Sequence, residues 1–240
     1  KPIYAISFGE TELFPRHAAT FVRLPGHVRW IVMDSKGKES IVAPYSVTAP
    51  AWLVSNNYSS GLPWAQRKLF FMAGHIPKIK ISPVRHNVYR SLLNRSDATV
   101  FGTGAHADVK NTRVSYNEYV QLGMRHKFCV VASGDNFATP KFTEAILFAA
   151  HGGCLPFVVS AGYPGKWPFE KRFSLRNHGI FTTTRDLRAA LRVAENMNAT
   201  RATQMRSYFQ SVASAYRSIP PNLNTTTAST TLIDEMCELN

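Results

Sequence analysis

Apolar runs alternate with segments of helical periodicity from about residue 60 onward. Residues 68–73 (KLFFMA), 127–131 (KFCVV) and 154–159 (CLPFVV) are almost entirely apolar, which would bury both faces of each strand. Such strands are typical of parallel sheets that helices cover on both sides. Shorter runs at 98–101 and 179–183 predict two more strands. The pattern predicts a Rossmann-like α/β domain.

The helix expected after residues 127–131 has the clearest periodicity. Thr139 is its predicted N-cap, and Pro140 occupies its first turn. Apolar residues then recur along one predicted face, at Phe142, Ala145, Ile146, Ala149 and Ala150. Lys141 and Glu144 share a face away from this single buried stripe. Further helices are predicted over residues 83–94, 115–122, 186–196 and 201–216.

The first 60 residues have a different pattern. Short β-type runs at 3–8, 28–33 and 40–42 predict strands of a mixed sheet. Residues 56–63 (NNYSSGLP) have the composition of a loop and mark the expected boundary. The predicted organisation is therefore a first domain over 1–60, a Rossmann-like domain over 61–218 and a carboxyl-terminal tail over 219–240.

The composition is that of a packed globular protein, because 45% of residues are hydrophobic and only 18% are charged. No apolar run reaches the roughly 18 residues of a membrane-spanning helix. The net charge of +13 fits an acidic glycan partner, a nucleic acid or simple solubility. Because the basic residues are scattered and form no recognised nucleic-acid motif, no nucleic-acid partner is expected.

Cysteines and asparagines bear on the compartment. Three cysteines without C-x-x-C spacing predict neither a disulfide framework nor a metal site. Acceptor sequences for N-glycosylation, N-x-S/T, occur at Asn57, Asn94, Asn198 and Asn224. Their number favours a protein of the secretory lumen that carries surface glycans, with coincidence as the open alternative.

The loop at 132–140 (ASGDNFATP) is the first candidate for a ligand site. It follows a predicted strand, and open α/β sheets bind ligands at the carboxyl ends of their strands. A helix start attracts phosphate, so Lys141 could contact a diphosphate and Glu144 the hydroxyls of a ribose. The alternative is an exposed ion pair with no function. Residues 102–107 (GTGAHA) fit a dinucleotide fingerprint but lack the helix that should follow it.

Residues 126–158 resemble the signature of the exostosin family, glycosyltransferase family 47. The family pattern is SKFCL, a loop with Pro and Gly, S-P-R-x-x-E-A-I and then GC-x-P-V. Weaker matches are 38–45 (KESIVAPY), 67–74 (RKLFFMAG) with the following Arg85, and 168–170 (PFE). The similarity spans roughly residues 36–175.

The resemblance implies a GT-B fold, in which two Rossmann-like domains face a cleft and the second holds the nucleotide sugar. Family members are inverting transferases that use donors such as UDP-sugars and need neither metal nor cofactor. Arg85 and Lys141 would balance the diphosphate charge, and Glu144 would hold the ribose. Ser133, Gly134 and Thr139 would add hydrogen bonds at the loop and helix start. This sequence also lacks the D-x-D pair with which other transferases hold a divalent ion.

Several positions depart from the family pattern. Lys141 replaces its Arg, Ala132 replaces its loop Pro, and the Trp after Pro-Phe-Glu is absent. Two complete domains need about 350 residues, so residues 1–60 would be an incomplete acceptor-side domain. Its candidates for a general base are Glu10, Glu12, His17 and Asp34, among which the motif makes no choice.

The expected function is transfer of a sugar from a UDP-sugar to a glycan or glycoprotein acceptor, an acidic glycan being one candidate. The expected location is the Golgi or another secretory lumen, reached through an upstream signal anchor outside this chain. The alternative is an inactive exostosin-like domain that serves as a structural subunit with protein partners in a larger assembly.

Overall fold

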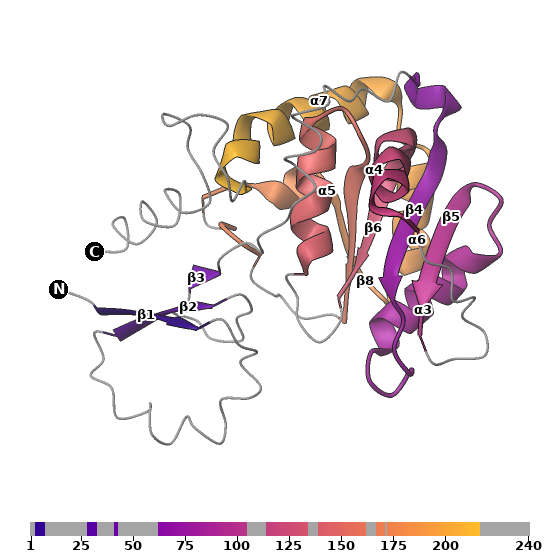
Figure 1. Cartoon of the computed structure of the whole chain (residues 1–240). Coiled ribbons are helices and arrows are strands. Elements are labelled where there is room, and N and C mark those ends of the chain that lie inside the picture. The colour runs from indigo at the N-terminus through magenta and orange to yellow at the C-terminus, as the bar shows by residue number, and fades with distance from the viewer. Residues whose placement is uncertain are drawn as a thin grey trace.

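The computed structural model describes residues 62–104, 114–133, 139–161, 167–170 and 172–216 (Figure 1). It also describes the backbone of three strands nearer the amino terminus, Ile3–Ser7 (β1), Val28–Val32 (β2) and Ile41–Val42 (β3). Gly134, Asn57 and Asn224 lie outside these residues, as do the base candidates Glu10, Glu12, His17 and Asp34.

A five-stranded parallel sheet is the centre of the described structure, with strand order β5-β4-β6-β7-β8. Its strands are Lys68–His75 (β4), Ala98–Thr103 (β5), His126–Ala132 (β6), Leu155–Ser160 (β7) and Ile180–Thr183 (β8). Every residue of β7 is buried, and so are six of the seven in β6. Continuous burial agrees with the apolar runs and confirms the α/β class with a parallel sheet.

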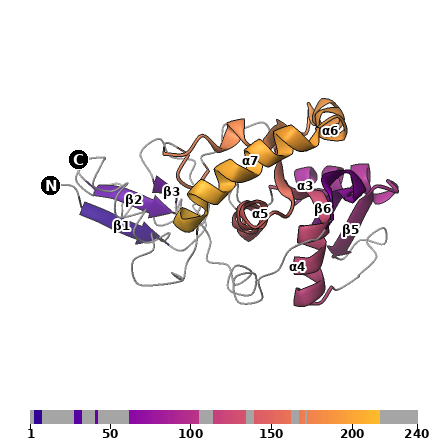
Figure 2. The same cartoon turned by 90° about the horizontal axis from the view of Figure 1, so that it is seen from above.

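Helices flank this sheet. They span Pro83–Leu93 (α3), Tyr116–Arg125 (α4), Pro140–Ala150 (α5), Leu187–Glu195 (α6) and Ala199–Val212 (α7). The connection through α3 leads from β4 to β5, whereas α4 and α5 lead the chain the other way along the sheet. Because parallel crossovers are right-handed, α3 covers one face and α4 and α5 cover the other (Figure 2). The direction of the chain thus reverses at β4.

The structure corrects two details of α5. Eight of its eleven residues are buried, so the prediction of a single buried stripe is wrong. The helix packs against β6 and β7 and also against α7, and two sets of neighbours bury two faces. Thr139 is the N-cap as predicted, but its side chain accepts no capping hydrogen bond. Its backbone carbonyl accepts from the Phe142 N–H at 2.9 Å instead.

The three amino-terminal strands form their own sheet, in the order β1-β2-β3. Both pairs are parallel, so the prediction of a mixed sheet is wrong for these strands. Strands of two to five residues are too short for the pattern of apolar and polar positions to reveal whether their neighbours are parallel. The boundaries at 60 and 218 fall at residues outside or next to the described parts and stay predictions.

Cys129 on β6 and Cys154, the residue before β7, form a disulfide with Cα atoms 5.3 Å apart. The sequence analysis, which excluded only a disulfide framework, did not anticipate this single bond. The two strands are neighbours, with Phe128 opposite Leu155, and that register brings the cysteines together. The spacing of the cysteines along the sequence does not show that these two strands are neighbours. Among the described helices, none combines the length and apolar character needed to cross a bilayer.

Candidate functional site

A cavity of about 380 Å³ opens at the carboxyl ends of β4 and β5. Its walls are the last residues of these strands, the first turns of α4 and α5, and the segment before α4. Those residues are Ala73, Gly74, His75, Phe101, Thr103, Val114, Tyr116, Tyr119, Lys141 and Glu144. The chain reverses its course along the sheet at β4, which is where open α/β sheets bind ligands. Lys141 and Glu144 line this cavity, which lies at the ends of β4 and β5 and not at the loop 132–140 where the sequence analysis expected the site.

Glu144 is the most constrained of these side chains. Its Oε2 accepts a hydrogen bond from the Tyr119 hydroxyl and another from Lys141 Nζ at 2.8 Å. Among the described residues its Oε1 accepts no hydrogen bond, and 12% of the side chain is exposed. The carboxylate therefore has one oxygen held by the protein and one left for a ligand.

Lys141 is held less tightly. Its ammonium lies 3.9 Å from the centre of the Tyr119 ring, a cation–π distance, and its side chain is 37% exposed. Lys141 and Glu144 form the i, i+3 ion pair that the sequence analysis gave as the alternative to a ligand site. It is not a fully solvated one, because the acid is largely buried and faces the cavity.

Tyr119 is one of the wall residues that the sequence did not point to. Its ring is buried against Phe71 and Phe148, with centroids 5.3 and 5.8 Å away. Burial, followed by the negative charge of Glu144, raises the pKa of Tyr119 well above its usual value. The phenol therefore stays protonated and donates to the acid. No motif in the sequence marks this residue.

Arg85 approaches the same edge from α3 and does not line the cavity. Its Nη1 donates to the carbonyl of His75 at 3.0 Å, and His75 is a wall residue. Arg85 and Lys141 therefore reach the end of β4 from opposite faces of the sheet. The structure brings these two cations to one strand end without joining them in one cavity.

Of the predicted loop and cap residues that the structure describes, Ser133 and Thr139 do not line the cavity. Ser133 is buried, and its N–H donates to the carbonyl of Val159 at 2.9 Å, so this group is used inside the fold. The hydroxyl of Thr139 is buried and has no hydrogen-bond partner among the residues that the structure describes. A ligand at the start of α5 could supply an acceptor for that hydroxyl. Gly134 lies outside the described residues.

The site combines a carboxylate oxygen, a cation and aromatic walls. Such a set can bind a polar ligand that has hydroxyl groups and a negative charge, with Tyr116 and Phe101 offering apolar contact. Within the described residues, no three His, Cys, Asp or Glu side chains are grouped as a metal would require. The acceptor sites Asn94 and Asn198 are both exposed.

The sequence matches no protein-family model and no curated protein. Fold and site by themselves define the class of this protein. It is an α/β protein with a parallel sheet, compatible with a Rossmann-like fold, and it has a polar cavity where the chain reverses its course along the sheet.

Proposed function

We propose that this chain contains the donor-binding part of an inverting, metal-independent glycosyltransferase of the exostosin type, with a GT-B arrangement and a UDP-sugar as donor. One observation carries the proposal: Lys141 and Glu144, which the motif match selects, meet at a cavity at the switch point of a parallel sheet.

The chemistry follows from charge. An acceptor hydroxyl attacks the anomeric carbon of the donor, the bond from that carbon to the diphosphate oxygen breaks, and UDP leaves with the electron pair. Lys141, which lines the cavity, would stabilise the growing negative charge directly. Arg85 lies outside the cavity wall, bonded to the His75 carbonyl, and would add positive charge from the other face of the β4 end. Glu144 would accept a ribose hydroxyl through Oε1. The acceptor proton goes to a base on the acceptor side, which stays unassigned.

The compartment proposed is the Golgi or another secretory lumen. The Cys129–Cys154 disulfide supports this, because disulfides persist in oxidising compartments and are rare in the cytosol. Exposure of Asn94 and Asn198 supports it further, because glycans need surface positions.

Calorimetric titration of the full-length protein with UDP tests the proposal. At 100 times its dissociation constant UDP should add about 2.7 kcal/mol to stability, visible as a higher melting temperature. Glu144→Gln replaces a charged acceptor by a neutral one of the same size and should weaken binding about tenfold. Glu195→Gln is the matched control, since Glu195 pairs with Arg95 elsewhere. A folded full-length protein that binds no UDP would end the proposal.

The second candidate is an inactive exostosin-like domain in a larger assembly. Its supporting observation is that Lys141, the cation expected at the diphosphate, already pairs with Glu144 and covers Tyr119. This candidate predicts no UDP binding and a stable complex with protein partners. The titration above separates the two candidates.

A further inference from the structure

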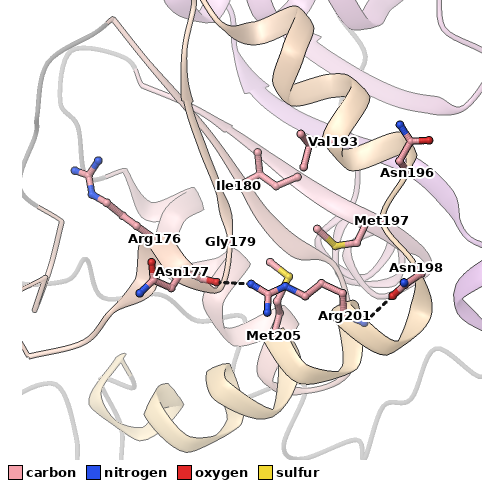
Figure 3. Close-up of a pocket in the computed structure, with 10 residues that line it drawn as sticks. All are labelled: Arg176, Asn177, Gly179, Ile180, Val193, Asn196, Met197, Asn198, Arg201 and Met205. Carbon is pink, nitrogen blue, oxygen red and sulfur yellow. Dashed lines mark hydrogen bonds between the residues drawn. The ribbon is translucent and has the colours of Figure 1, made fainter.

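A second cavity, of about 620 Å³, lies at the other edge of the sheet, where β8 begins (Figure 3). Ile180 and Met205 are buried and form apolar parts of its wall. Arg176, Asn196 and Arg201 are exposed at its rim. The cavity therefore offers an apolar surface surrounded by hydrogen-bonding groups, and it shares no residue with the candidate donor site.

Asn198 belongs to the wall of this cavity and to the acceptor sequence Asn198-Ala199-Thr200. It is the N-cap of α7, where its Oδ1 accepts from the Arg201 N–H at 2.8 Å (Figure 3). An N-glycan is attached through Nδ2, so the cap and the glycan use different atoms. Asn198 is exposed and can carry both.

We propose that this cavity holds the first N-acetylglucosamine units of a glycan on Asn198. A pyranose with an N-acetyl group has apolar faces and a polar edge, which match the apolar wall and the amide and guanidinium groups at the rim. Val193, also in the wall, is 57% exposed and is an apolar surface that a sugar ring would cover.

Because the glycan is covalently attached beside the cavity, even weak binding would keep the cavity occupied most of the time. A ligand on a short linker has an effective concentration of about millimolar, so a site with a dissociation constant near 0.1 mM would be occupied about nine tenths of the time. The proposal rests on the secretory location proposed above.

Attachment joins Nδ2 to the anomeric carbon of a sugar from a lipid-linked diphosphate donor. The lipid diphosphate leaves, and the amide loses one proton.

Asn94 provides an internal comparison. It is also exposed and also lies at a helix end, as the C-cap of α3, but it does not line this cavity. A glycan there should extend freely into solvent. The two acceptor sites can therefore be compared within one molecule.

The experiment uses full-length protein secreted from eukaryotic cells. Mass spectrometry of glycopeptides measures occupancy, and an endoglycosidase that cleaves within the chitobiose core is then added under native conditions. Cleavage at Asn198 should be about tenfold slower than at Asn94, because the enzyme reaches only the undocked tenth. Val193→Asp, at an exposed position outside the acceptor sequence, should accelerate cleavage at Asn198 alone.

Stability gives a second measurement. Thr200→Ala removes the glycan at Asn198 but keeps the capping side chain, and Ser96→Ala removes the glycan at Asn94. Thr200→Ala should lower the melting temperature of the secreted protein, and Ser96→Ala should not. Unglycosylated protein made in bacteria controls for the substitutions themselves.

The outcomes separate the two levels of the argument. Glycan on Asn94 but none on Asn198 overturns the docking proposal alone, as do equal cleavage rates at the two sites. Absence of glycan from both overturns the docking and the secretory location together. UDP binding is measured separately and does not depend on any of these results.

Discussion

Replacing Tyr119 with phenylalanine removes one hydroxyl and keeps the buried ring. The ring still packs between Phe71 and Phe148 and still supports the Lys141 ammonium, 3.9 Å from its centre. Only the hydrogen bond to Glu144 Oε2 is lost. The substitution therefore tests whether the hydroxyl positions the carboxylate for a ligand at Oε1.

The size of the effect can be worked from these contacts. A hydrogen bond to a charged group contributes about 1.5–3 kcal/mol, but Lys141 remains on the same oxygen at 2.8 Å. We expect about 1–2 kcal/mol lower stability in denaturant unfolding. UDP affinity should fall about three- to tenfold, because Glu144 must then be ordered on binding.

The pH dependence gives a further readout. The folded pKa of Tyr119 is raised above the unfolded value of 10.0, so below pH 10 the phenol is protonated in both states. Above pH 10 the unfolded state releases its proton first, and stability falls as pH rises. Tyr119→Phe should reduce that slope.

Tyr208→Phe is the control for a lost hydroxyl. The Tyr208 side chain hydrogen-bonds the backbone of Ser174 and does not line the donor cavity. It should lower stability and leave UDP affinity unchanged. If Tyr119→Phe lowers stability but binds UDP as tightly as the wild-type protein, the hydroxyl only stabilises the fold and the positioning argument is refuted.

Two further predictions concern the fold. Burial lowers the pKa of His126 below 6.5, so as pH falls through 6.5 only the unfolded state takes up a proton and stability decreases. Denaturant unfolding measured from pH 7.5 to 5.5 should show this loss of stability. If the same loss is found in His126→Gln, His126 is not its cause. The Cys129–Cys154 disulfide joins residues 25 positions apart, and by the chain-entropy relation a loop of this length stabilises the fold by about 3.5 kcal/mol. Replacing both cysteines with alanine should therefore lower the free energy of unfolding by about that amount. Equal stability of the two proteins would show that the bond does not form.

The sequence determined the main elements of the described fold. The strands expected at 68–73, 127–131 and 154–159 are present as β4, β6 and β7, with ends shifted by no more than two residues. Such runs are decisive because a strand buried on both faces must be apolar at every position. Pro140 likewise marks the first residue of α5, since proline fits a first helical turn.

The sequence also determined part of the candidate site. A loop after a central strand, followed by a helix with Lys141 and Glu144 near its start, is a local pattern that can be identified without coordinates. It placed both residues where a cavity is found. It did not separate residues that line the cavity from Ser133 and Thr139, because burial depends on what packs over the loop.

The tertiary structure decided which distant residues meet. Tyr119 and Glu144 are 25 positions apart, as are Cys129 and Cys154, and both pairs form only because strands and helices take particular places around one sheet. The direction of β1 to β3 and the burial of α5 on two faces are decided in the same way. Local sequence fixes φ and ψ preferences and the apolar face of an element, but the neighbour of that face is chosen by the packing of the whole domain.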